Sequence, residues 1–155
     1  MKRLELQNLL LDTFGHLPDA QLMALTIYGE ARGESREGKI AVGSVILERV
    51  EHRKWDGETI QEVCLMPWQF SCFLPDDPNF PALKFIAEDW DTKITRSPDL
   101  QECFNIAAML LSGVIARTPE IAAAHATQYK TINCRAAWAS KMTKIVTVGA
   151  HEFYA

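Results

Sequence analysis

Two glutamates, Glu30 and Glu34, stand in the segment Tyr28-Gly-Glu-Ala-Arg-Gly-Glu34, where an apolar run gives way to glycines. A side chain at such a boundary lies at the edge of a core. Partial desolvation favours the protonated form of a carboxyl group, which a general acid needs. We therefore predict that Glu30 is a catalytic acid at the mouth of a groove. Gly33 indicates that the helix ends before Glu34, which we expect to be a structural acid at the next helix start.

A second group of candidates lies in the segment 64–81, which contains four prolines and four aromatic residues. The prolines exclude a regular helix, and long irregular loops in compact domains are often functional. Aromatic rings beside Gln69 and Ser71 suit a sugar-binding wall, because rings cover sugar faces while amides and hydroxyls bond sugar hydroxyls. The alternative is that the rings of the loop fill the core beneath it: Trp68, Phe70 and Phe73.

The apolar pattern predicts the elements that must position these residues. We expect helices over 3–14, 18–31, 36–52, a short one from 59, 81–90 and 97–117. Segment 40–47 is almost wholly apolar and therefore buried, and small residues at Gly43 and Ser44 allow the Glu30 helix to pass close. The charged end of that helix, 48–54, is expected to be solvated surface.

The C-terminal third of the chain is predicted to contain short strands as well as helices. Segment 121–129 is open between helix and extended chain, and 135–142 is predicted as a short helix around Trp138. Segment 143–154 is typical of two short strands that turn at Gly149 and Ala150. We thus predict a mainly helical α+β fold with a small β-hairpin or sheet.

Composition excludes several classes of function. The 155 residues suggest one domain, 1–155, which we expect to be a monomer, and the net charge of −4 implies no general affinity for nucleic acid. No apolar run is long enough to span a membrane. The leucines of segment 1–11 are interrupted by polar residues and no cleavage site follows, so we expect an amphipathic helix, no signal peptide, and synthesis in the cytoplasm.

The four cysteines are Cys64, Cys72, Cys103 and Cys134. None forms a CxxC pair, and no histidine stands close in a zinc pattern. We expect buried free thiols and no metal or other cofactor, with a disulfide between Cys64 and Cys72 left open.

Three blocks of the sequence share the order and spacing of motifs in one enzyme family. They are Tyr28-Gly-Glu-Ala-Arg-Gly-Glu34 with the apolar segment 37–50, Pro67-Trp-Gln-Phe-Ser71, and Ala126-Thr-Gln-Tyr129 followed by Trp138 and Gly149-Ala-His-Glu-Phe-Tyr154. Together they resemble the SleB-type cell wall hydrolases, the spore cortex-lytic enzyme family, over about residues 22–154. Gln128 and Lys130 stand where that family often has histidines, which puts in doubt a role for a histidine there.

The resemblance implies a lysozyme-like helical domain that cleaves the glycan strand of bacterial peptidoglycan after muramic acid, with Glu30 as acid/base. It implies lytic transglycosylation as the favoured reaction. A short chain without a signal peptide also resembles a phage endolysin, made in the host cytoplasm and released to the cell wall through a holin. The candidate substrate-binding residues are Gln69, Phe70, Ser71, Tyr129, Glu34 and His151.

Several alternatives stay open. Tyr129 could donate a hydrogen bond to substrate or to Glu30, or be a core residue, and His151 could be structural. A hydrolytic muramidase needs a second carboxylate, for which Glu34, Asp76 and Asp77 are candidates. An amidase that cuts the glycan–peptide bond would need zinc, for which the histidines show no ligand spacing. A wall-binding module would bind sugars without cutting them.

Overall fold

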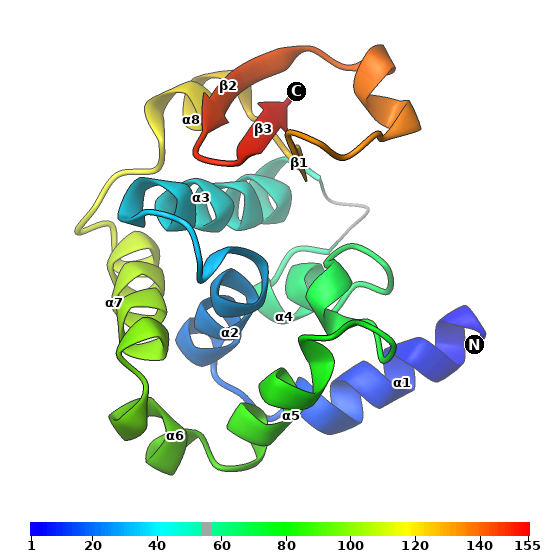
Figure 1. The fold of residues 1–155 in the computed structure, drawn as a ribbon, viewed down its shortest axis with the longest axis vertical. Helices are drawn as coiled ribbons and strands as arrows, with labels where there is room; N and C mark the ends of the chain where they lie inside the picture. Colours follow the sequence, from blue (N-terminus) through cyan, green and yellow to red (C-terminus); the bar gives the residue numbers. More distant parts are fainter. Residues whose placement is uncertain (54–56) are drawn as a thin grey trace.

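The computed structural model describes residues 1–53 and 57–155. Helices pack around a hydrophobic core, and a small antiparallel sheet lies at one end of the molecule (Figure 1). The helices are α1 (Arg3–Phe14), α2 (Asp19–Ala31), α3 (Arg36–His52), α4 (Ile60–Cys64), α5 (Phe80–Glu88), α6 (Trp90–Arg96), α7 (Pro98–Ser112) and α8 (Pro119–Ala124), with 3-10 turns η2 (Ser71–Phe73) and η3 (Ala137–Lys141). The strands are β1 (Gln128–Thr131), β2 (Lys144–Val148) and β3 (His151–Tyr154). The expected mainly helical α+β fold is confirmed.

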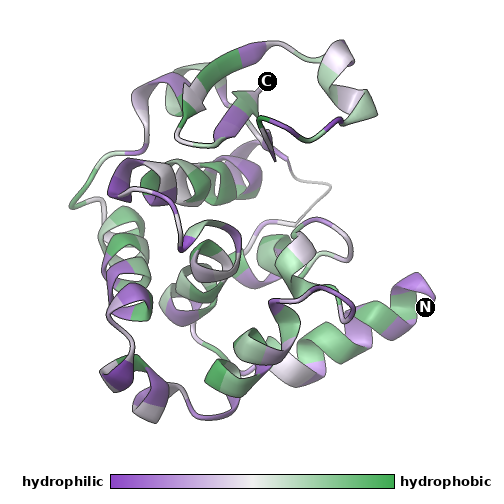
Figure 2. Ribbon diagram, in the orientation of Figure 1, coloured by the Kyte–Doolittle hydropathy of each residue, from purple (hydrophilic) through white to green (hydrophobic). Residues whose placement is uncertain are grey.

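Helix α3 crosses the middle of the molecule, with the sheet on one side and α2 and α7 on the other (Figure 1). Its hydrophobic middle is flanked by hydrophilic ends (Figure 2). Ser35 caps the helix by accepting the Gly38 N–H at 3.2 Å. A Cβ at Gly43 would lie 2.6 Å from Leu110 of α7 and 3.2 Å from Ile27 of α2. The predicted close approach of the Glu30 helix is thus confirmed, and α7 shares it.

The expectation that the charged end of α3 is solvated holds for Glu51 and His52, which are exposed, and is wrong for three other residues. Glu48, Arg49 and Arg53 are only 1%, 3% and 5% exposed. Arg49 Nε and Arg53 Nη1 both donate to the carbonyl oxygen of Thr127, at 2.7 Å and 3.2 Å. These charged groups can be buried because each pairs with residues that are distant in the sequence. No local sequence pattern could reveal such partners. Lys54 lies outside the described residues.

Several helix ends also differ from the predicted ones. Helix α7 ends at Ser112 rather than near 117, because Gly113 adopts a left-handed conformation (φ 75°) and caps it. Helix α5 ends at Glu88, where Asp89 leaves the helical conformation (φ −151°, ψ 66°). The next helix, α6, was not predicted. The ambiguous segment 121–129 divides into the end of α8 and the start of β1.

The sheet has the strand order β1-β3-β2, with both pairs antiparallel. The predicted hairpin is confirmed, and its turn uses Gly149 at φ 57°. Strand β1 is the third strand, with Tyr129 opposite Phe153 and Thr131 opposite His151. Tyr129 and His151 are therefore diagonal neighbours, and their ring centroids lie 5.2 Å apart.

All four cysteines are free thiols, so the open possibility of a Cys64–Cys72 disulfide is not realised. Three of them are buried as expected, whereas Cys134 is exposed. Within the described residues, no helix has the length and apolar character needed to cross a membrane.

Candidate active site

Glu30 is the penultimate residue of α2, and both of its carboxylate oxygens accept hydrogen bonds. Oε1 accepts the backbone N–H of Cys72 at 3.2 Å, and Oε2 accepts the hydroxyl of Tyr129 at 3.0 Å. The two donors come from η2 and β1. Three elements that are distant in sequence therefore fix the position of one carboxylate.

This carboxylate opens into a groove of about 500 Å³. Five of the predicted site residues line it: Glu30, Gln69, Ser71, Tyr129 and His151. Trp68, one of the rings considered for a sugar-binding wall, also lines it, and so do residues that were not predicted as site residues: Arg49, Gln128, Lys130, Thr131, Cys134, Ala136 and Trp138. The groove thus combines one acid, two cations, two indole rings and several amide and hydroxyl groups.

Two predicted substrate-binding residues do not line the groove. Phe70 is 2% exposed and lies in the core, with the guanidinium of Arg49 4.7 Å from its ring centroid. Glu34 accepts the backbone N–H of Ala150 at 3.1 Å, and the same oxygen lies 3.1 Å from His151 Nδ1. Glu34 therefore holds the β2–β3 turn through the Ala150 N–H and lies beside His151, a geometry that agrees with the structural role expected for it.

The aromatic residues of the loop divide between groove and core. Trp68 is 51% exposed and stands at the groove with a left-handed backbone (φ 65°), whereas Phe70 and Phe73 are buried. The sugar-wall interpretation therefore fits only Trp68, and the core interpretation fits the other two rings. Trp138, whose ring stacks edge-on against Tyr154 at 5.2 Å, supplies a second indole from outside the loop.

Of the described residues that line the groove, Glu30 alone carries a carboxylate. Asp77 Oδ1 accepts the backbone N–H of Asn79 at 2.8 Å, which ties it into its own loop. Asp76 lines a different hollow beside Met1 and Leu6. The candidates for a second catalytic carboxylate therefore do not meet Glu30 in the groove.

Burial and the negative charge of Glu30 raise the pKa of Tyr129 well above its ordinary value of 10.0, and nearby Arg49 opposes the shift. The Tyr129 hydroxyl consequently keeps its proton at neutral pH. It can donate to the Glu30 carboxylate and can accept a hydrogen bond when Glu30 is protonated.

Sequence reasoning missed one of the two hydrogen bonds that Glu30 accepts, the one from the backbone N–H of Cys72. Gln69 and Ser71 could have bound an N-acetyl group or oriented Glu30, and the structure shows Gln69 Oε1 accepting from Arg53 Nη2 at 3.2 Å. A backbone donor carries no side-chain signature. Its presence follows only from the path of the loop after Phe70.

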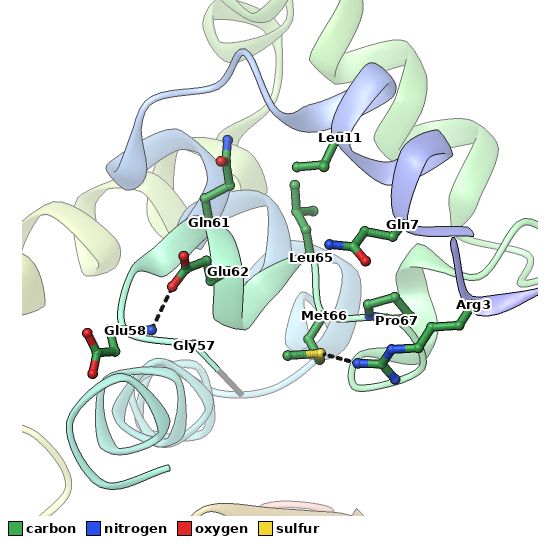
Figure 3. A pocket seen from close by; sticks show the side chains of 10 residues that line it. All are labelled: Arg3, Gln7, Leu11, Gly57, Glu58, Gln61, Glu62, Leu65, Met66 and Pro67. Carbon is green, nitrogen blue, oxygen red and sulfur yellow. Dashed lines mark hydrogen bonds between the residues drawn. The ribbon is translucent and has the colours of Figure 1, made fainter. Parts of the chain in front are cut away.

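A second cavity, of about 630 Å³, lies between α1 and α4 (Figure 3). Its Glu62 accepts the backbone N–H of Glu58 at 2.7 Å, and its Arg3 donates to the sulfur of Met66 at 2.9 Å. These polar groups satisfy one another locally. The converging acid, tyrosine and indole rings make the Glu30 groove the better candidate for chemistry.

The structure thus places one carboxylate, held by a backbone N–H and a tyrosine hydroxyl, in an aromatic-edged groove of a mainly helical fold. Residues 33–154 match the family described as Cell Wall Hydrolase, and the chain belongs to that family and is an enzyme. The match begins just after Glu30.

Individual relatives agree with this assignment. The spore cortex-lytic enzyme of Oceanobacillus iheyensis is 36% identical over 80 residues, which cover 47% of this chain and 29% of that enzyme. The chain therefore spans less than a third of the curated relative.

Two solved structures share the fold. The catalytic domain of the germination-specific lytic transglycosylase SleB from Bacillus anthracis has a TM-score of 0.58 at 24% identity, covering 88% of this chain and 93% of that one. The catalytic domain of Bacillus cereus SleB has a TM-score of 0.57 at 24% identity, covering 88% and 89%.

Proposed function

We propose that this enzyme cleaves the β-1,4 bond between N-acetylmuramic acid and N-acetylglucosamine in peptidoglycan by lytic transglycosylation. The observation that carries the proposal is Glu30, the one carboxylate among the described residues that line the groove, held by a backbone N–H and by Tyr129. Hydrolysis by the usual glycosidase routes uses two carboxyl groups. Transglycosylation needs only one.

In this reaction protonated Glu30 donates its proton to the glycosidic oxygen as the bond to C1 of muramic acid breaks. The 6-hydroxyl of the same muramic acid then attacks C1, and the Glu30 carboxylate takes the proton of that hydroxyl. The product is a 1,6-anhydro sugar, no water is consumed, and Glu30 ends as it began. Tyr129 remains bonded to the same oxygen of Glu30 in both steps.

The rest of the groove suits a peptidoglycan strand. Trp68 and Trp138 offer rings for sugar faces, and Gln69 and Ser71 offer partners for N-acetyl and hydroxyl groups. Arg49 and Lys130 add positive charge to the lining, which suits the carboxylates of peptide stems, and Lys130 Nζ is itself paired with Glu152 at 2.7 Å.

The test is mass spectrometry of the fragments released from purified peptidoglycan by the wild type, by Glu30→Gln and by the control Glu88→Gln. Glu88 is exposed at the end of α5. We expect anhydromuropeptides from the wild type and the control, and none from Glu30→Gln. Reducing muramic acid ends would indicate a hydrolytic muramidase instead, and freed peptides with intact glycan would indicate an amidase.

A role in host lysis as a phage-type endolysin, with release through a holin, stays a prediction. Expression in a bacterial host with and without a co-expressed holin tests it. We expect lysis only when the holin is present and Glu30 is intact. Lysis in the absence of the holin would show that release of the enzyme does not depend on this partner.

A further inference from the structure

Outside the groove, three side chains that can bind metals converge at the end of α3. Glu48 is 1% exposed, His52 follows it by one helical turn, and His125 caps α8 in a left-handed conformation (φ 52°). The two histidine side chains are 40% and 56% exposed. A buried carboxylate thus faces two imidazoles that solvent can reach.

The three ligand atoms have the spacing of a shared metal ion. Glu48 Oε2 lies 3.1 Å from His125 Nδ1 and 3.4 Å from His52 Nε2, and all three atoms lie within 4.8 Å of one another. Nitrogen and oxygen ligands about 2.0–2.1 Å from a tetrahedral zinc ion stand about 3.3 Å apart. The two imidazole rings lie with centroids 3.9 Å apart, and each has one nitrogen within 3.4 Å of the same Glu48 oxygen.

We propose that Glu48, His52 and His125 bind one divalent transition-metal ion, with Zn²⁺ as the best match. Two imidazoles and one carboxylate suit zinc, nickel or copper, whereas calcium and magnesium prefer oxygen ligands throughout. The exposure of both rings leaves the fourth position to water. This site is separate from the proposed catalytic chemistry.

The surroundings of Glu48 support a metal ligand. Arg117 Nη1 donates to Oε1 of Glu48 at 3.1 Å, which orients the carboxylate so that Oε2 faces the histidines. Metal-bound carboxylates are commonly fixed by such hydrogen bonds. Arg117 is also paired with Glu51, so two carboxylates face one guanidinium. The cluster keeps an excess of negative charge for a cation when the imidazoles are neutral.

A metal here would fasten α3 to the segment that leads into β1. His125 lies two residues before Thr127, whose carbonyl oxygen already accepts from Arg49 and Arg53, and four residues before Tyr129. An ion that binds the native state and not the unfolded chain stabilises the fold. We therefore expect Zn²⁺ to raise the melting temperature.

The competing explanation is that each imidazole only donates a hydrogen bond to Glu48. Titration calorimetry of the tag-free, metal-free chain with ZnCl₂ separates the two. It is done in a Cys134→Ser background, because the exposed thiol of Cys134 could itself bind zinc. We expect one ion per chain, a higher melting temperature, and an affinity that falls more than about tenfold in His52→Ala and in His125→Ala.

The matched control is His16→Ala, because His16 contacts the carbonyl oxygen of Ala87 and lies outside the cluster. Its affinity for zinc should equal that of the parent. With Co²⁺ in place of zinc, the intense visible absorption of tetrahedral cobalt should appear in the parent and be lost in His125→Ala. Absence of saturable zinc binding, or unchanged affinity in the double variant His52→Ala/His125→Ala, would overturn the proposal. Both histidines are partly exposed, so these variants should fold.

Discussion

Tyr129 is the side chain on which the proposed mechanism depends most after Glu30. Its hydroxyl donates to Glu30 Oε2 at 3.0 Å, and burial keeps it protonated. Hydrogen bonds to charged groups contribute about 1.5–3 kcal/mol, and about 1.4 kcal/mol corresponds to a tenfold change in rate. We expect Tyr129→Phe to lower kcat roughly tenfold or more while KM changes little.

The measurement is the initial rate of fragment release from purified peptidoglycan over a range of substrate concentrations. The control is Tyr28→Phe, because Tyr28 contacts Arg32 instead of lining the groove. A Tyr129→Phe enzyme with unchanged kcat would show that this contact is structural only.

Trp68 has an exposed ring and a backbone φ of 65°, a conformation that residues other than glycine adopt rarely. Such conformations cost about 1–2 kcal/mol and persist where the surroundings enforce them. We expect Trp68→Ala and Trp68→Gly to raise KM for peptidoglycan alike, because both remove the ring.

The two variants should differ in stability. Glycine adopts positive φ without penalty, so Trp68→Gly should be more stable than Trp68→Ala by about 1 kcal/mol in urea unfolding. Wild-type KM in either variant would exclude Trp68 from substrate binding.

At the scale of elements, α2 and η2 must pack closely for Glu30 to meet its backbone donor. A Cβ at Gly29 would lie 2.7 Å from both Cβ and Sγ of Cys72, too close to be accommodated without movement. We expect Gly29→Ala to lower the free energy of unfolding by about 1–3 kcal/mol, the usual cost of overpacking, and to lower activity because η2 carries the N–H that binds Glu30.

Gly33 provides the matched control, because a Cβ there meets nothing within 4 Å. Urea unfolding and turnover of peptidoglycan should be nearly unchanged in Gly33→Ala. If Gly29→Ala matched Gly33→Ala in both measurements, the close approach of α2 and η2 would not matter for the site.

The elements were largely predictable because their signals are local. Ser35 as a cap, Ser97 before Pro98, and the glycine turn at Gly149 each mark a boundary through the chemistry of one or two residues. The prediction failed where a boundary depends on backbone conformation alone. At Gly113 the sequence allows the helix to continue, and the left-handed backbone ends it.

At the scale of the whole molecule, the candidate site could be predicted only in part. Glu30 and Tyr129 were identified by local pattern and by family resemblance, and the fold brings them into contact. Arg49 was expected to be solvated, yet it is 3% exposed and lines the groove. Its Nε donates to the carbonyl oxygen of Thr127, and this partner could not be foreseen because it lies far along the chain. Contacts between distant segments decide which charges are buried, and a single sequence does not encode them in any local pattern.

Because of the buried thiols, we expect the free energy of unfolding of the whole fold to depend on pH in the alkaline range. Burial raises the pKa values of Cys64 and Cys103 from 9.0 to about 12, and it also raises those of Cys72 and Tyr129. Below pH 9 these thiols are protonated in both folded and unfolded chains. Above pH 9 only the unfolded chain releases their protons, so the free energy of unfolding must fall.

Between pH 9 and about 12 we expect Cys64 and Cys103 each to contribute a loss of about 1.4 kcal/mol per pH unit. Urea unfolding at half-unit steps from pH 8 to 11 measures the slope, and the double variant Cys64→Ala/Cys103→Ala should show a shallower one even though it is less stable at pH 8. Equal slopes in the two proteins would mean that these thiols ionise as readily in the folded chain as in the unfolded one. Water would then reach the core around α2, α4 and α7 at alkaline pH. The close packing that positions Glu30 would not depend on excluding water from this core.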